Sequence, residues 1–109
     1  MEKECLFCNI VNKQIPTDFL YVNDQVVVFK DINPSAPVHL LIVPIKHIRS
    51  INDVTDDDLN IISNMIVTGK QMAKKAAVAT TGYKLFFNVE KGGGQVIFHL
   101  HLHLIGGWK

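Results

Sequence analysis

The chain contains little cysteine, little net charge and no long apolar run, and each shortage argues against a class of protein. Two cysteines among 109 residues argue against a scaffold held together by disulfides. A formal net charge of +1 provides no broad attraction for a nucleic-acid backbone, and no apolar run is long enough to cross a bilayer. The first residues show no secretion signal. We therefore expect a cytoplasmic protein, with entry into the nucleus left open, and neither a nucleic-acid nor a membrane partner.

Composition and organisation indicate one folded domain. Hydrophobic residues make up 48% of the chain, which argues against disorder. The sequence shows no internal repeat and no linker, so residues 1–109 are expected to form a single domain. A chain of this length is near the size at which pairing with a second copy adds useful burial, which makes a homodimer reasonable.

Hydrophobic periodicity and turn residues predict the order of the elements. Apolar residues at helical spacing predict a short helix that begins near Leu6 and ends before Ile15. Runs of β-branched and aromatic residues predict strands at residues 19–22, 26–29, 39–43, 83–89 and 96–105. An apolar stripe predicts a long helix that runs to about Ala79. Hairpin-length connections favour an α+β domain with an antiparallel sheet.

The long helix has a clear starting signal at Thr55. Its side chain is suited to cap a helix, Asp58 follows three positions later, and negative charge is favourable at a helix N-terminus. The consecutive residues Asp56, Asp57 and Asp58 could also form a cation site, but a capped and solvated first turn explains them better. We assign them no chemistry.

Three of the five histidines recur at every second position, as His99, His101 and His103. Side chains alternate across a strand, so neighbouring imidazoles would lie ~6–7 Å apart on one face of a strand. The opposite face would turn Phe98, Leu100, Leu102 and Leu104 into the core. A single strand histidine is more often buried and bonded to a backbone carbonyl. Three in register indicate a functional site.

The segments next to these histidines suit a bound phosphate. Imidazole is a competent nucleophile, and its protonated form donates two hydrogen bonds to an anion. The loop Gly92–Gly94 lets backbone amides approach a ligand closely, and Gln95 can donate an amide hydrogen bond. A flexible hairpin loop would also explain the glycines taken alone. Asp31 suits either a pair of sugar hydroxyls or a turn before Asn33, and the sequence does not separate these roles.

In these features the chain resembles the histidine-triad nucleotide-binding proteins, specifically their Hint branch. The resemblance rests on the alternating histidines with Asn88 and the glycine-rich loop upstream, and it covers nearly the whole chain. Further matching stretches are Ile15-Pro16, Phe29-x-Asp31-Ile32, Ala36-Pro37-x-His39, Val43-Pro44-x-Lys46-His47-Ile48, Gly82-Tyr83 and Gly93-Gly94-Gln95. The resemblance implies a five-stranded antiparallel sheet with one short and one long helix, and a homodimer.

The resemblance also implies a hydrolase of purine nucleotides, chiefly a phosphoramidase that releases an amine and a nucleoside monophosphate. His101 would attack the α-phosphorus and form a covalent nucleotidyl-histidine, while His103, His99 and His39 order and polarise that centre. The nucleotide would be bound by Phe7, Ile10, Ile15, Phe29, Asp31, Ile32, Asn88, Gly94, Gln95, Val96, His101 and His103. In this set Asp31 would hold the ribose, the apolar side chains would surround the base, and Asn88 and Gln95 would contact the phosphate.

Two features depart from the Hint pattern, and three alternatives stay open. Val96 stands where many of these proteins carry a serine, and the tail is shortened to Trp108-Lys109, so turnover or leaving-group choice could differ. A dinucleoside polyphosphate hydrolase is one alternative, although that branch usually continues with a proline-arginine pair where this chain has Gly106-Gly107. The others are a nucleotide-binding module with little turnover, and a hydrolase that uses His99, His101 and His103 as metal ligands.

Cys5 and Cys8, with His47 and His99, resemble the zinc quartet of some histidine-triad proteins. Two thiolates and two imidazoles suit a closed tetrahedral zinc site, which would attach the first helix to the sheet without performing chemistry. Simple burial explains a pair of nearby cysteines equally well. Catalysis itself is expected to need no cofactor.

Overall fold

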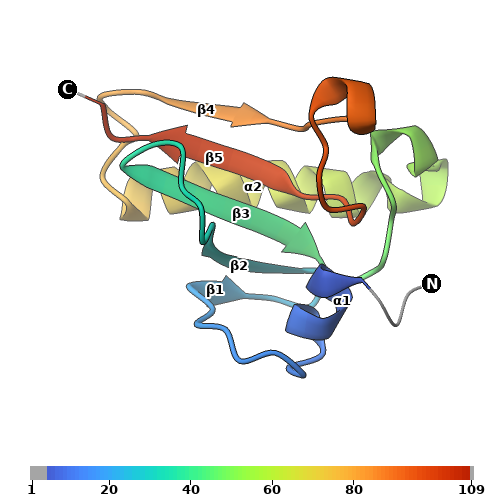
Figure 1. Ribbon diagram of the computed structural model, residues 1–109. Helices are drawn as coiled ribbons and strands as arrows, with labels where there is room; N and C mark the ends of the chain where they lie inside the picture. Colours follow the sequence, from blue (N-terminus) through green and yellow to red (C-terminus); the bar gives the residue numbers. More distant parts are fainter. Residues whose placement is uncertain (1–4, 109) are drawn as a thin grey trace.

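The computed structural model describes residues 5–108; residues 1–4, where a secretion signal was sought, and Lys109 of the short tail lie outside this range. The helices are α1 (Leu6–Val11) and α2 (Leu59–Lys75), and the strands are β1 (Tyr21–Val22), β2 (Val26–Lys30), β3 (Val38–Pro44), β4 (Tyr83–Phe86) and β5 (Leu102–Gly106). Short 3-10 turns occur at η2 (Ile51–Asp53), η3 (Asp56–Asp58) and η4 (Lys91–Gly93). The strands form one antiparallel sheet in the order β1-β2-β3-β5-β4, with α2 across one face and α1 in front of the other (Figure 1). The expected α+β fold is confirmed.

Alternation along the strands separates the core from the site. The sheet face that packs on α2 contributes Leu40, Ile42, Leu102 and Leu104 to a cluster that Met65 of α2 completes. Because side chains alternate, His103 lies between two of these leucines and faces the other way. Its strand partner Leu41 packs in a second cluster with Phe7 and Ile10 of α1. The sheet therefore carries its main core on one side and its histidines on the other.

The helical segment begins after Thr55 as predicted, but its first turn is the 3-10 turn η3; α2 itself begins at Leu59 and ends earlier than predicted. Thr55 and Asp58 form a capping box, and Lys46 Nζ donates to Asp58 Oδ1 at 2.6 Å. These partners explain the aspartates as a helix start. The helix ends at Lys75 rather than near Ala79, because Ala77 adopts a φ of 61°, a left-handed conformation that terminates helices.

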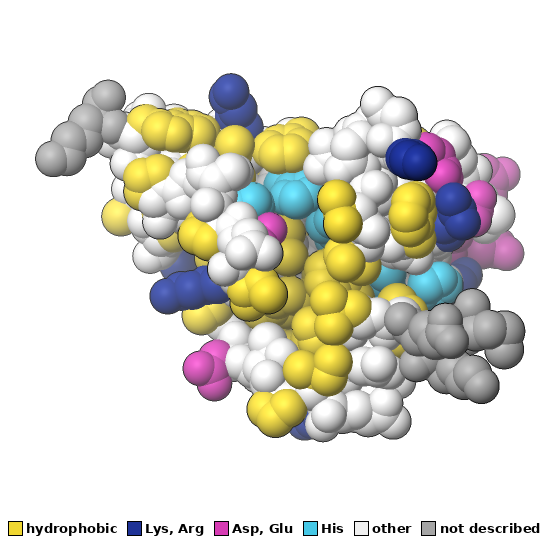
Figure 2. Space-filling view, viewed as in Figure 1, with side chains coloured by type: hydrophobic (Ala, Val, Ile, Leu, Met, Phe, Trp, Pro, Cys, Tyr) yellow, Lys and Arg dark blue, Asp and Glu magenta, His cyan; other side chains and the backbone are white. Residues whose placement is uncertain are grey.

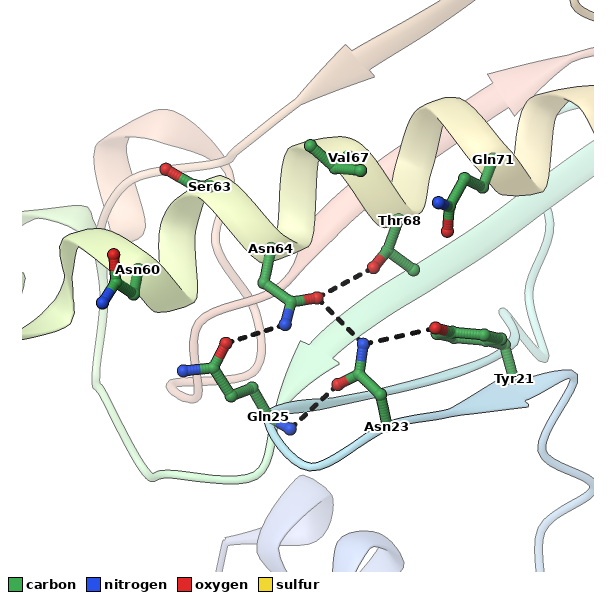
Figure 3. Close-up of a pocket in the computed structure, with 9 residues that line it drawn as sticks. All are labelled: Tyr21, Asn23, Gln25, Asn60, Ser63, Asn64, Val67, Thr68 and Gln71. Atoms are coloured by element: carbon green, nitrogen blue, oxygen red, sulfur yellow. Dashed lines mark hydrogen bonds between the residues drawn. The ribbon is translucent and has the colours of Figure 1, made fainter.

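A polar hollow connects α2 to the turn between β1 and β2 (Figure 3). Asn64 accepts hydrogen bonds from Asn23 Nδ2 and Thr68 Oγ1, both at 3.0 Å, and donates to Gln25 Oε1 at 2.7 Å. Asn23 Oδ1 in turn accepts the backbone N–H groups of Gln25 and Val26. Because these amides bind one another, they act as a structural connection between the helix and the hairpin.

The histidine segment is a strand only in its second half, contrary to the prediction for residues 96–105. Strand β5 begins at Leu102, so His99 and His101 lie in irregular structure before it. The neighbouring strand β3 ends at Pro44, which has no N–H to extend the ladder. The N–H of Leu100 instead donates to the carbonyl of Ile48 at 2.6 Å.

Two further expectations need correction. Strand β4 ends at Phe86 rather than Val89, since the chain turns there toward the glycine-rich loop. Phe98, expected in the core, is 36% exposed and lies under the Arg49 guanidinium, 4.5 Å from the ring centroid. Within residues 5–108, no helix combines the length and the apolar character needed to cross a membrane.

Candidate active site

A cleft of about 490 Å³ opens on the sheet face opposite α2. Figure 2 shows histidine side chains at one end of a hollow bordered by hydrophobic side chains. Its lining includes all of the residues expected to bind nucleotide except Gln95, namely Phe7, Ile10, Ile15, Phe29, Asp31, Ile32, Asn88, Gly94, Val96, His101 and His103. A volume of this size is typical of small-molecule sites. Residues far apart in the sequence thus converge on one cleft.

His101 directs an unprotonated ring nitrogen toward this cleft. Its Nδ1 lies 2.7 Å from the carbonyl oxygen of His99, so Nδ1 carries the proton and donates it. Nε2 therefore keeps the free lone pair. Phe7 packs edge-on against the imidazole with the ring centroids 5.1 Å apart, which restricts its orientation. An imidazole held in this way can act as a nucleophile.

A second chain of hydrogen bonds determines the protons on His39 and His103. The N–H of Ser35 donates to His39 Nδ1 at 3.0 Å, so His39 carries its proton on Nε2. That Nε2 lies 2.9 Å from His103 Nδ1 and 3.4 Å from Asp31 Oδ2. His103 then carries its proton on Nε2, which is buried and has no hydrogen-bond partner among residues 5–108. A buried donor without a partner costs about 1–3 kcal/mol, so this N–H is suited to a ligand atom.

Burial keeps His101 and His103 neutral. Desolvation first, and the neighbouring His101 and His39 second, lower the pKa of His103 to about 4. Desolvation also lowers the pKa of His101, although its bond to the His99 carbonyl opposes the shift. Phe86 stacks on the His103 ring with centroids 4.7 Å apart, which excludes water from that face. At neutral pH the site therefore presents one imidazole lone pair and one neutral N–H.

The glycine-rich loop contributes Asn88, Gly94 and Val96 to the rim of the cleft. Asn88 Nδ2 donates to the carbonyl of Gly93 at 2.9 Å and so closes the loop. Gly94 adopts a φ of 88°, and a β-carbon there would stand 3.4 Å from the Asn88 amide nitrogen. Glycine permits both the conformation and the close approach. Val96 is 81% exposed and supplies no hydroxyl to the rim.

Asp31 forms the turn that the sequence suggested and also lines the cleft, where a sugar would lie. Its Oδ1 accepts the N–H of Asn33 at 2.8 Å, as a turn-forming aspartate does. Its Oδ2 points toward His39, and the side chain lines the cleft. Ile32, which follows it, is 89% exposed and forms an apolar lip. The carboxylate is therefore shared between the turn, the histidine chain and the cleft.

Gln95 does not reach the cleft, contrary to the expectation that it contacts phosphate. Its Nε2 donates to the carbonyls of Arg49 and Ile97 at 2.8 and 3.1 Å, and its Oε1 accepts the N–H of Glu90 at 2.8 Å. The side chain is buried behind the glycine-rich loop. Its amide hydrogens are committed to backbone carbonyls, so the geometry gives it a role in shaping the loop.

His99 is also turned away from the cleft and belongs to a compact group with Cys5, Cys8 and His47. Its Nδ1 lies 3.4 Å from Cys5 Sγ, 3.5 Å from Cys8 Sγ and 3.2 Å from His47 Nδ1, and Cys8 Sγ lies 3.2 Å from His47 Nδ1. Tetrahedral zinc with ordinary bond lengths has nitrogen–nitrogen edges of ~3.3 Å and nitrogen–sulfur edges of ~3.6 Å. The four side chains therefore match the dimensions of a closed metal site.

The proton on His99 is also placed correctly for a metal ligand. Its Nε2 donates to the carbonyl of Pro44 at 2.8 Å, so Nδ1 offers a lone pair to the group. Desolvation lowers the pKa of His99 to about 4, which keeps the ring neutral. His99 affects the cleft through its backbone carbonyl, which accepts the hydrogen bond from His101, and not through its imidazole.

A second group that could hold a cation consists of Asp31, His39 and His103. Neither group found among residues 5–108 combines His99, His101 and His103, so the geometry does not support these three as a shared ligand set. The alternating spacing brings them near one another, but His99 faces the cysteines.

Sequence reasoning missed Ser35 and Phe86. The Ser35 N–H decides which nitrogen of His39 is protonated, and a loop position shortly before a histidine is too weak a signal to find it. The Phe86 stack results from its pairing opposite His103 across β4 and β5, a register that the sequence does not specify. Other lining residues that were not anticipated are Leu6, Pro16, Thr17, Lys30, Asn33, Leu41 and Ile97.

Comparisons with known proteins identify the family of the chain. A family model described as "Scavenger mRNA decapping enzyme C-term binding" matches residues 4–107. The purine nucleoside phosphoramidase of Escherichia coli strain K12 is 38% identical over 107 residues, which cover 98% of this chain and 90% of that protein. The crystal structure of a HIT family hydrolase from Legionella pneumophila superposes with a TM-score of 0.94 at 45% identity, covering 97% of this chain and 95% of that chain. A zinc-bound histidine triad family protein from Mycobacterium smegmatis has a TM-score of 0.87 at 25% identity, covering 100% of this chain and 78% of that chain. On this fold, site and similarity, the chain belongs to the histidine-triad (HIT) family of nucleotide hydrolases.

Proposed function

We propose that this protein is a purine nucleoside phosphoramidase, which hydrolyses a phosphorus–nitrogen bond and releases an amine and a nucleoside monophosphate. One observation carries the proposal: His101 offers a lone pair and His103 offers an unpartnered N–H in the same cleft. The name of the Escherichia coli relative supports the same substrate class. The apolar lining suits a base, and Asp31 suits the ribose.

The two histidines divide the chemistry. His101 Nε2 attacks the α-phosphorus, a nitrogen–phosphorus bond forms, and the bond to the amine breaks as His103 Nε2 delivers a proton to the departing nitrogen. Water then attacks the phosphorus, returns a proton to His103 and frees His101. His39 and Asp31 orient His103 through the bond to its Nδ1. The reaction needs no cofactor.

The test combines turnover with covalent labelling. The parent protein should hydrolyse a purine phosphoramidate and carry a nucleotidyl group on His101, detected by mass spectrometry. His101→Ala should lose the label and at least ~10³-fold in turnover, and the variant should keep its fold because the ring lines the cleft. Unfolding of this variant would contradict the placement of the ring.

The same assays separate the alternatives. Labelling of folded, chelator-treated protein supports the histidine mechanism, whereas loss of hydrolysis on chelation would indicate metal catalysis. Tight affinity for nucleoside monophosphate without turnover would assign a binding module. Faster cleavage of dinucleoside polyphosphates than of phosphoramidates would assign the other hydrolase class.

We also propose that Cys5, Cys8, His47 and His99 hold a structural zinc ion. The matching interatomic distances and the bond from His99 to Pro44 support it, and a zinc-bound relative has the same fold. Elemental analysis should find about one zinc per chain in the parent protein and little in Cys8→Ser. Stoichiometric zinc in Cys8→Ser would contradict this ligand set. Thiolate ligands favour a reducing compartment, which supports a cytoplasmic location.

A homodimer is the third proposal. Strand β4 is an edge strand of the sheet, and an edge offers unpaired backbone groups to a second chain. Exposed Ile66 and Val67 on α2 add apolar surface. Light scattering should give twice the chain mass of 12.2 kDa, and a monomeric mass at micromolar concentration would contradict the proposal.

A further inference from the structure

Glu90 adopts a backbone conformation that glycine normally occupies. Its φ of 62° and ψ of 175° fall in a region that side chains strongly disfavour. The residue stands directly before η4, at the start of the glycine-rich loop. Strain of this kind persists where surrounding contacts hold the residue in place, and it is concentrated at functional sites.

The Glu90 carboxylate is held by two neighbours from the segment before η2. Arg49 donates from Nη2 to Oε1 at 2.9 Å and from Nε to Oε2 at 3.4 Å, and Ser50 Oγ donates to Oε2 at 2.7 Å. These hydrogen bonds, from Arg49 first and Ser50 second, lower the pKa of Glu90. Ser50 is fully buried, and the Arg49 guanidinium is packed on the Phe98 ring. Arg49 and Ser50 therefore hold the Glu90 carboxylate in a defined position.

The backbone of the loop closes around the same residue. The carbonyl of Glu90 accepts the N–H groups of Gly93 and Gln95, both at 3.0 Å. The Gln95 amide bridges the Glu90 N–H and the Arg49 carbonyl. These bonds attach the loop to the segment at residues 49–50, which does not line the cleft, while Asn88, Gly94 and Val96 do.

We infer that Glu90 is a positioning residue, whose carboxylate, anchored by Arg49 and Ser50, places the glycine-rich loop where it receives the phosphate of the nucleotide. The inference rests on the proposed function, because it assumes that a phosphate enters this end of the cleft. The anchor contacts the loop and none of the apolar residues that surround the base. Its loss should therefore weaken recognition of the phosphate and spare recognition of the nucleoside.

Glu90→Gly tests this, because glycine accepts the backbone conformation while the side-chain anchor is lost. Ala77→Gly is the matched control: Ala77 has a φ of 61°, is exposed and does not line the cleft. Adenosine and AMP are the probes, and their dissociation constants are measured with kcat and KM for one phosphoramidate. Glu90→Gln, which keeps one acceptor oxygen, should fall between the parent and Glu90→Gly.

We expect Glu90→Gly to weaken AMP binding at least about tenfold, because small displacements of a binding group are costly, and to change adenosine binding less than about twofold. Ala77→Gly should change neither. Equal weakening of AMP and adenosine, or no change in either, would overturn the inference. If Glu90→Gly does not fold, Arg49→Lys tests the inference instead, because the Arg49 side chain is 52% exposed and its replacement should be tolerated. Lysine cannot make the two hydrogen bonds that Arg49 donates to the Glu90 carboxylate, so this variant should weaken AMP binding more than adenosine binding.

Failure of the proposed function would look different. If the parent protein binds adenosine and AMP equally, the cleft is not a phosphate site, and the proposed function fails. Amide hydrogen exchange at residues 93–95 still tests the anchor, because it needs no ligand. Faster exchange in Glu90→Gly than in Ala77→Gly supports the anchoring role, and unchanged exchange overturns it.

Discussion

At the scale of single residues, backbone groups decide what each histidine can do. The His99 carbonyl occupies Nδ1 of His101 and leaves Nε2 free, whereas the Ser35 N–H occupies Nδ1 of His39 and places its proton on Nε2. The proposed function therefore gives the three histidines at alternate positions three different tasks: a metal ligand, a nucleophile and a proton donor. The residue type supplies the chemistry, and its hydrogen-bond partner selects which part of that chemistry is used.

Adding a hydroxyl to the cleft rim at Val96 should increase turnover. Val96→Thr conserves the shape of the side chain, and the new hydroxyl can donate to the phosphate or the leaving group; we expect kcat to rise up to about tenfold, as for one added hydrogen bond. Stability should change by less than about 0.5 kcal/mol because the residue is largely exposed. Val96→Ala is the control without a hydroxyl, and an equal gain there would show that bulk had limited the rate.

The low pKa of His103 should make the protein less stable in mild acid. Desolvation lowers this pKa to about 4 in the folded state, whereas an unfolded histidine titrates near ~6.5. Between these values the unfolded chain binds the extra proton, so the stabilisation is complete above about pH 6.5 and is lost as the pH falls toward 4. The lowered pKa values of Asp58 and Glu90 act at lower pH.

Urea unfolding at pH 7 and pH 5 measures this effect. The free energy of unfolding should be smaller at pH 5 by on the order of 2 kcal/mol for one such histidine. His103→Gln cannot titrate, so its two values should lie closer together. An identical difference in the parent and the variant would show that His103 is not the group responsible.

At the scale of elements, capping signals and periodicity predicted the kind and order of every helix and strand, but several lengths were overestimated. The capping box at Thr55 and Asp58 is local, so the start of the helical segment at η3, which α2 continues from Leu59, was predictable. The end of α2 depends on the left-handed conformation of Ala77, for which alanine gives no sequence signal. The lengths of β4 and β5 depend on which neighbouring strands supply hydrogen bonds. The sequence alone does not show which strands pair.

Replacing Ala77 by glycine should stabilise the protein. Glycine adopts a left-handed conformation without the steric cost that a β-carbon imposes, so we expect a gain of about 0.5–1 kcal/mol in the free energy of unfolding. Ala79→Gly is the control, since Ala79 does not have a left-handed conformation. Glycine there only increases the conformational entropy of the unfolded chain, which lowers the free energy of unfolding. Denaturant melts of the three proteins provide the comparison, and equal effects of both substitutions would contradict the structural reason.

At the scale of the whole molecule, α1 links the Cys/His group to the cleft. Cys5 and Cys8 flank the turn that carries Phe7, whose ring contacts both His99 and His101. Phe7 and Ile10 also line the cleft on the apolar side that suits a base. Metal binding at one site should therefore affect nucleoside binding at the other through a single short helix.

Removing the metal should weaken nucleoside and nucleotide binding alike. A chelator that releases α1 from the sheet should weaken the binding of adenosine and of AMP by similar factors, roughly threefold to tenfold, because α1 carries apolar residues of the cleft. It should also lower the melting temperature. Labelling of His101 should persist because the proposed reaction uses no metal. Selective loss of AMP binding would instead connect the metal to the phosphate loop.

The resemblance to histidine-triad proteins supplied the residues expected at the cleft, and all but Gln95 line it. The residues themselves determined the element order, the capped turn at Thr55, and the alternation that separates Leu102 and Leu104 from His103. These properties follow from local spacing and from residue chemistry. Tertiary structure alone decided between the two roles expected of His99, whose ring faces the cysteines and not the cleft. It also decided that Gln95 supports the loop from behind and that Phe86 covers His103. Each of these depends on which distant backbone group or ring meets the side chain, and contacts between distant segments arise only when the sheet assembles.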